Sequence, residues 1–379
     1  MLQLVFGRSG YGKTEYIRNR IADKIDRGET QVLLITPEQY SFISEYSLLE
    51  QLGEARAHAV RCLSFSRLCD ECNRLYGADG RKPLTKGGKA ILMKTAIDQV
   101  RPDLELFEKK GSSAAFVQSM TGIYDEMKSC NLSGAAVYAA ADDLDTDILR
   151  CKMRDFSRIM TAYEALLGDR FADPANRLTR LYDQIKDQNY FAGQTVFLDG
   201  FNGFVAQEYK ILERIIAEAK AVYIALDSDS FGTGDGYDLF AYVNETAGIL
   251  QRIADKAGVP TNALQLGENC RTDYADLRRV EQYIFADQAP ETEIPAEHIR
   301  LYAASTVTDA CNDLALQIKG LLRCGYRAGE IAVTMRDREK YAPVLASAFE
   351  KYGVPYLDVI SNNNRLFSVS DQSKSLVME

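Results

Sequence analysis

The sequence predicts an α/β fold with a parallel sheet, and two observations carry that prediction. Short apolar segments at 2–6, 31–36 and 57–63 alternate with amphipathic segments at 15–26 and 41–51. A glycine-rich run lies between the first apolar segment and the first amphipathic one. Alternating strands and helices are typical of a doubly wound parallel sheet, because each helix returns the chain to the edge where the next strand begins.

The glycine-rich run fits G-x-x-x-x-G-K-[ST], the phosphate-binding P-loop pattern. It reads Gly7-Arg8-Ser9-Gly10-Tyr11-Gly12-Lys13-Thr14. Backbone N–H groups of such a loop face phosphates, and the following helix N-terminus favours anions. We expect Lys13 to reach the β- and γ-phosphates of ATP and the Thr14 hydroxyl to bind Mg²⁺. A turn that only capped a helix would not explain Lys13 and Thr14.

The remaining segments predict further domains. Residues 77–190 have helical periodicity and no convincing strand. Strands are then expected at 195–198, 221–226, 299–304 and 331–335, with helices at 207–219, 238–257 and 308–322. We therefore predict a sheet domain in two parts (1–76 and 191–285), a helical insertion (77–190), a linker (286–297) and a second, incomplete domain (298–379).

A magnesium-binding acid is expected at the end of a neighbouring strand. Asp199 follows the apolar run TVFL and fits that role. Gly200 stands where helicases and many ATPases carry the Glu that activates water, so we expect poor hydrolysis; Glu208 is a weak substitute candidate. A turn is the favoured interpretation for Asp227 to Asp229. Arg336 follows another predicted strand, where it could reach a γ-phosphate or simply be exposed.

The composition of the chain limits which metal sites, nucleic-acid contacts and cellular locations we expect. The chain has 379 residues, a net charge of −9, two histidines and eight cysteines. Cys69 and Cys72 form a C-x-x-C, but they lack the further ligands that zinc or an iron–sulfur cluster needs, so we expect neither. The acidic balance means that any nucleic-acid contact must use a local patch or another protein of the same complex. With neither a signal peptide nor a membrane span expected, the protein should be cytoplasmic.

Several segments carry a resemblance to a known family. In order, they are GRSGYGKT, ITPEQYSF, LSFSRL, FLDGFNGF, DLFAYVNETAGIL and GYRAGEIAVTMRDREKYAPVLASAFEKYGVPYLD. Together they resemble the N-terminal third of AddB, one of the two proteins of AddAB-type helicase–nucleases. The resemblance implies a RecA-like domain with a helical insertion, the start of a second RecA-like domain, the helicase–nuclease A subunit as a partner, double-stranded DNA ends as substrate and a role in recombinational repair.

The resemblance also implies which residues lie along a single-strand DNA path. In addition, this chain differs from the family's pattern in some features. The matching positions are Thr36, Gln39, Phe65, Ser66 and Arg67; Phe65 could equally belong to the core and Arg67 to the solvated surface. In this chain we expect neither the family's iron–sulfur nuclease domain nor the Gln before the P-loop with which superfamily 1 helicases read adenine. We therefore expect an ATP–Mg²⁺-binding scanning part; an active DNA-dependent motor and a small-molecule kinase are the alternatives.

Overall fold

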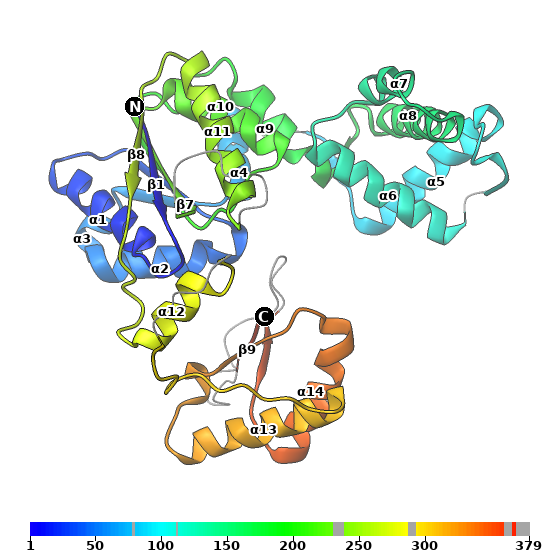
Figure 1. Cartoon of the computed structure of the whole chain (residues 1–379). Helices are drawn as coiled ribbons and strands as arrows, with labels where there is room; N and C mark the ends of the chain where they lie inside the picture. The colour runs from blue at the N-terminus through cyan, green and yellow to red at the C-terminus, as the bar shows by residue number, and fades with distance from the viewer. Residues whose placement is uncertain (78–79, 111–112, 230–238, 287–292, 360–365, 369–379) are drawn as a thin grey trace. The chain divides into compact units, whose positions relative to one another are not determined.

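The computed structural model describes residues 1–77, 80–110, 113–229, 239–286, 293–359 and 366–368 (Figure 1). The chain forms two compact units, Met1–Asp273 and Tyr274–Glu379. No helix in the described part of the chain combines the length and the apolar character needed to cross a bilayer.

The first unit is built on a six-stranded sheet in the order β3-β2-β6-β7-β1-β8, with every neighbouring pair parallel. The strands are β1 (Leu2–Gly7), β2 (Val32–Ile35), β3 (Val60–Leu63), β6 (Thr195–Leu198), β7 (Ala221–Asp227) and β8 (Thr261–Gln265). The predicted α/β class is confirmed. β8 was not predicted, and the strand expected at 57–63 begins only at Val60, because residues up to Ala57 form a short helix.

Helices cover both faces of this sheet. They are α1 (Lys13–Asp26), η1 (Glu38–Tyr40), α2 (Ser41–Leu52), α3 (Glu54–Ala57), α4 (Phe65–Tyr76), α9 (Arg177–Ile185), α10 (Ala206–Glu218) and α11 (Ala241–Lys256). The strand β2 shows how two cores arise. Leu33 and Ile35 join the core beneath α4, α10 and α11, whereas Val32 and Leu34 join the core beneath α1 and α2. Successive side chains of a strand point to opposite faces, so an unbroken apolar strand serves both.

The segment between β3 and β6 is helical, as predicted, and has its own apolar core. Its elements are β4 (Lys82–Pro83), α5 (Lys86–Val100), η2 (Arg101–Asp103), η3 (Glu108–Lys110), α6 (Ala114–Ser129), α7 (Gly134–Ala141), α8 (Asp147–Leu167), β5 (Phe171–Ala172) and η4 (Pro174–Asn176). The expectation of no strand was wrong in one detail, because β4 and β5 pair as a two-residue ribbon. We call α5 to α8 the helical segment.

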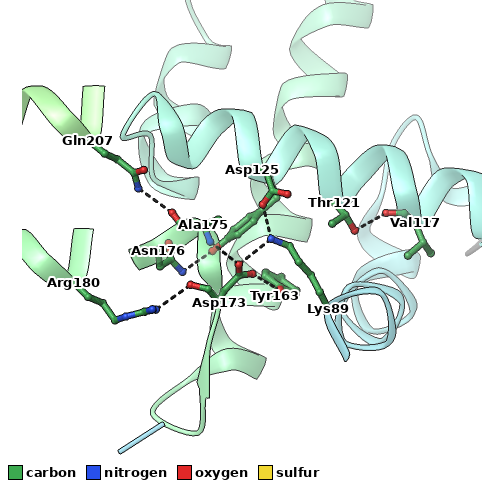
Figure 2. Close-up of polar contacts among 11 residues, drawn as sticks. Lys89, Val117, Thr121, Asp125, Tyr163, Asp173, Ala175, Asn176, Arg180 and Gln207 are labelled. Carbon is green, nitrogen blue, oxygen red and sulfur yellow. Dashed lines mark hydrogen bonds and ion pairs between the residues drawn. The ribbon is translucent and has the colours of Figure 1, made fainter. Parts of the chain in front are cut away.

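A buried polar cluster lies where the helical segment rejoins the sheet (Figure 2). Asp173 is fully buried. Its Oδ1 accepts a hydrogen bond from Lys89 Nζ at 2.9 Å, and the Tyr163 hydroxyl donates to its Oδ2 at 2.6 Å. Lys89 also pairs with Asp125. Burial, followed by the hydrogen bond to Asp173, raises the pKa of Tyr163, so this hydroxyl stays protonated and donating.

We call the six-stranded sheet and the helices that cover it the sheet body. Two hydrogen bonds join the polar cluster to helices of the sheet body. Arg180 Nη1 of α9 donates to the Asp173 carbonyl at 3.0 Å, and Gln207 Nε2 of α10 donates to the Ala175 carbonyl at 3.0 Å (Figure 2). A backbone carbonyl that no helix or strand partner satisfies still needs a hydrogen-bond donor, and here the two side chains are the donors. The joint is therefore held by polar contacts with fixed directions.

The second unit contains α12 (Ala275–Tyr283), α13 (Val307–Arg323), η5 (Ala328–Glu330), β9 (Ala332–Thr334), α14 (Arg338–Tyr352), β10 (Leu357–Val359) and β11 (Leu366–Ser368). Ala315 and Ile318 of α13 share a core with Leu345 and Phe349 of α14. The strands form an antiparallel sheet in the order β10-β11-β9. The strand expected at 299–304 is wrong: this stretch has no regular structure, and Leu301 is 97% exposed, so no burial supports a strand there.

Candidate functional site

The glycine-rich loop lies between β1 and α1, at the carboxyl edge of the sheet. Gly10 has φ +89°, a conformation that other L-residues rarely adopt. A Cβ added there would also lie 2.9 Å from Arg271 Cβ. The loop conformation therefore requires glycine at this position for two independent reasons.

Lys13 begins α1 and bends back over the loop. Its Nζ donates to the Gly7 carbonyl at 2.7 Å and to the Arg8 carbonyl at 2.9 Å. It also pairs with Asp227 at the end of β7. The sequence favoured a turn for Asp227, so its pairing with Lys13 was missed. The ammonium group is held inside the loop by these three partners.

Thr14 and Asp199 meet across the same edge. The Thr14 hydroxyl hydrogen-bonds the Asp199 carboxylate, and the Gly200 N–H does so too. Asp199 is only 9% exposed, and burial raises its pKa against the opposing effect of these donors and of Lys13. A buried carboxylate beside a hydroxyl is an oxygen pair of the kind Mg²⁺ binds. The two residues predicted as metal ligands are thus brought together.

The chain after β8 braces the loop from its other side. Cys270 N donates to the Gly10 carbonyl at 2.8 Å, and Arg271 Nη1 donates to Ser9 Oγ at 3.1 Å. Arg8 is held by Asp229 at 2.7 Å. Sequence reasoning missed the 270–271 segment because β8 is a polar edge strand with no apolar pattern. An arginine shortly after a strand was the available signal.

A hollow of about 660 Å³ opens in front of these groups. Residues of the loop, of α1, of η1 and α2, of the Asp199 turn, of β7 and of the 270–271 segment line it. They are Ser9, Gly10, Gly12, Lys13, Thr14, Glu15, Arg18, Tyr40, Ile43, Ser44, Asp199, Gly200, Asn202, Ala225, Asp227, Cys270 and Arg271. The hollow has the size of a small-molecule site. It lies at the carboxyl ends of parallel strands, where ligands of open α/β sheets bind.

The turn after Asp199 explains the missing glutamate. Gly200 has φ +82°, a conformation that other L-residues rarely adopt, although a Cβ there would make only an ordinary contact with Pro37 Cδ at 3.4 Å. A glutamate at this position would therefore be strained in this backbone. Glu208 caps α10 instead: its Oε2 accepts from Val205 N at 2.9 Å. It is not among the described residues that line the hollow.

The residues expected along a DNA path follow β2 and β3 at the same sheet edge, but their exposure differs. Gln39 and Arg67 are exposed, and Arg67 pairs with Glu45 at 3.0 Å. Ser66 is half-buried and Thr36 is buried. Phe65 is 6% exposed and lies edge-on to Phe201, with ring centroids 5.8 Å apart. In this arrangement Phe65 is a core residue, and DNA contact remains a prediction for the exposed positions.

The other candidates lie elsewhere. Arg336 follows β9 in the second unit and lines a separate hollow with residues 337–341. Its contact with a γ-phosphate remains a prediction. Cys69 and Cys72 are buried on α4, and burial raises the pKa of these thiols to about 11 and about 12. Within the described residues, no group of three or more His, Cys, Asp and Glu side chains could hold a metal ion.

Fold and site together define an α/β protein whose parallel sheet presents a glycine-rich loop, a lysine and a buried carboxylate at one edge. A family model described as "ADDB, N-terminal" matches residues 4–281. The chain belongs to this family.

Curated relatives agree with that assignment. The chain is 29% identical to the B subunit of the ATP-dependent helicase/deoxyribonuclease of Clostridioides difficile (strain 630), over 93% of this chain and 32% of the relative. It is 28% identical to the protein of the same name from Clostridium tetani, over 96% and 33%. It is 25% identical to the protein of the same name from Thermoanaerobacter sp. (strain X514), over 95% of this chain and 32% of the relative. The chain therefore spans about a third of the length of these relatives.

Proposed function

We propose that this chain is the ATP-binding, helicase-like part of an AddB protein that acts on double-stranded DNA ends together with a helicase–nuclease A subunit. The relatives' names supply the ATP-dependent helicase and deoxyribonuclease context, and because they name one subunit of an enzyme they imply a partner. The observation that carries the proposal is the meeting of Thr14 with Asp199 beside Lys13. The complex would serve recombinational repair in the cytoplasm.

The site residues have distinct roles in this proposal. Lys13 exchanges its contacts with Asp227 and two loop carbonyls for the phosphates of ATP. Thr14 and Asp199 hold Mg²⁺, which neutralises phosphate charge when bound. Arg271 contacts the nucleotide in this proposal, which its position in the lining and its bond to Ser9 support.

The proposal assigns scanning rather than motor work to this chain. Gly200 offers no side chain to activate water, and Glu208 is engaged as a helix cap. Losing a general base typically costs about 10²–10⁴ in rate. We therefore propose that ATP binding, more than hydrolysis, is used by this part of the protein. The chain alone should neither unwind nor cleave DNA.

ATP affinity and turnover of the purified chain, with and without single-stranded DNA, test the proposal. We expect ATP–Mg²⁺ binding that Lys13→Ala weakens by tenfold or more, about 1.4 kcal/mol or above. Lys186→Ala, an exposed lysine on the sheet body, is the matched control and should change nothing. Unchanged affinity in Lys13→Ala would contradict nucleotide binding. Steady turnover above about 1 s⁻¹, stimulated by DNA and lost in Lys13→Ala, would support the motor instead.

A further inference from the structure

We propose that Arg18 binds the terminal phosphate of the nucleotide and makes the site selective for a nucleoside triphosphate over a diphosphate. The inference rests on the proposed function, because it adds a residue and a selectivity to the same hollow. Arg18 lies on α1, one helical turn after Thr14, and its side chain is half-buried. It lines the hollow in front of the glycine-rich loop.

Arg18 differs from the other basic side chains that line the hollow. Lys13 is held by Asp227 and two loop carbonyls, and Arg271 Nη1 donates to Ser9 Oγ at 3.1 Å. Arg18 forms neither a hydrogen bond nor an ion pair with any residue that the structure describes. A guanidinium has five N–H donors and keeps its charge in proteins. The donors of Arg18 are therefore available to an anion that enters the hollow.

The helix directs Arg18 towards the two proposed metal ligands. Residues four apart on a helix share a face, and helical side chains point back towards the helix N-terminus. The long side chain of Arg18 therefore extends over the turn that carries Thr14. Burial raises the pKa of Asp199, and Arg18 is among the positive charges that oppose this rise. This opposing effect agrees with a guanidinium near that carboxylate.

This location favours the terminal phosphate over the rest of the nucleotide. In P-loop proteins the lysine contacts the β- and γ-phosphates, and Mg²⁺ bridges oxygens of the same two groups. In the proposed function Thr14 and Asp199 hold that Mg²⁺, so the γ-phosphate lies beside this pair. Arg18 meets it there, and a guanidinium suits a phosphate because two of its N–H groups can bind two oxygens at once. ADP has no phosphate at this position, so Arg18 adds little to its binding.

A contact with the γ-phosphate differs in one measurable way from a role in which Arg18 only offsets the charge of Asp199. Offsetting that charge changes how Mg²⁺ is held. It therefore affects ATP and ADP alike, because both nucleotides use the same metal ligands. A direct contact with the γ-phosphate acts on ATP alone. The ratio of the two affinities separates the two roles.

Calorimetric titration of ATP and of ADP into the full chain, with excess Mg²⁺, measures both dissociation constants. Arg18→Gln should weaken ATP binding about tenfold, because a charge-assisted hydrogen bond to phosphate is lost, and should change ADP binding less than about twofold. Arg27→Gln makes the same change of charge at the exposed far end of α1 and should alter neither constant. Arg18→Lys keeps the charge without the bidentate geometry and should retain only part of the preference for ATP.

Melting curves should be the same for Arg18→Gln and the wild type, because Arg18 has no hydrogen-bond partner to lose among the described residues. Equal effects of Arg18→Gln on ATP and ADP, or no effect on either, would overturn the inference and leave the proposed function intact. If Arg18→Gln does not fold, Arg18→Lys decides: a reduced preference for ATP supports the inference, and an unchanged preference overturns it. A wild-type chain that binds neither nucleotide would contradict the proposed function itself, and the inference with it.

Discussion

The sheet body and the helical segment place their polar groups differently. In the sheet body, β2 and β6 are buried throughout, and Lys13 and Asp199 gather at the carboxyl edge, beside a hollow. In the cluster at the base of the helical segment, Lys89 and Tyr163 come from its helices, Asp173 from the chain just after it, and the three are sealed inside and satisfy one another. Because the polar groups at the sheet edge line a hollow, they can exchange their protein partners for a ligand. The buried cluster is closed to a ligand, so its hydrogen bonds contribute to stability alone.

Removing the centre of the sealed cluster should have the largest effect. Asp173→Ala takes the buried carboxylate from Lys89 and Tyr163, and breaking a buried pair costs about 3–5 kcal/mol. Amide hydrogen exchange should show the loss in α5 and α8, while ATP affinity stays unchanged. Asp183→Ala, an exposed carboxylate on α9, should cost less than about 0.5 kcal/mol. Equal, small losses in the two variants would contradict the difference between the regions.

A change in the glycine-rich loop should act in the opposite way. Gly10→Ala adds backbone strain and a clash with Arg271, so we expect a stability loss of about 1–2 kcal/mol and ATP affinity at least tenfold weaker. Gly28→Ala is the matched control, because Gly28 has φ +85° but open space around it. It should lose comparable stability and keep its ATP affinity. Calorimetric titration measures the ATP affinity of each variant, and melting curves measure its stability. Equal loss of ATP affinity in both variants would contradict a specific effect of the clash with Arg271.

The amino edge of the sheet offers a test by pH. Burial disfavours the Glu29 carboxylate, but bonds from Thr195, Lys220 and Lys24 outweigh it and lower its pKa from 4.5 to about 2. Because the folded-state pKa is lowered, the stabilisation is present above about pH 4.5 and is lost as the pH falls towards 2.

Glu29→Gln should therefore cost about 1 kcal/mol at neutral pH. The gap to the wild type should narrow as the pH falls through that window. Urea unfolding at neutral pH and inside the window measures both values. Glu213→Gln, a partly exposed carboxylate on α10, is the control for the lost charge. A gap that widens on acidification would refute the assignment.

The smallest effect is expected at the exposed edge. Arg67→Ala should change stability by less than about 1 kcal/mol, because its pair with Glu45 is exposed. If Arg67 contacts a DNA backbone, the variant should lower the log–log salt slope of single-strand binding by about 0.7. Arg74→Ala, an exposed arginine further along α4, should leave the slope unchanged. An unaltered slope in Arg67→Ala would place the DNA path elsewhere.

Part of the site was accessible from local sequence, and part was not. Gly7 to Thr14 and Asp199 were found because each follows an apolar strand directly. Asp227 and Arg271 were not, because their roles depend on β7 and β8 lying on either side of β1. Phe65 was open to two interpretations until its packing against Phe201 was seen. Sequence spacing cannot report such neighbours.

The sequence by itself determined the β1–loop–α1 unit, the apolar strands and the helical character of the long insertion, since local periodicity and glycine conformation are properties of neighbouring residues. The tertiary structure alone decided the strand order, the polar edge strand β8, the irregular stretch at 299–304 and the joint around Asp173. Those features depend on pairing and burial between residues far apart in the chain, and the free energy of such contacts exists only once the fold brings them together.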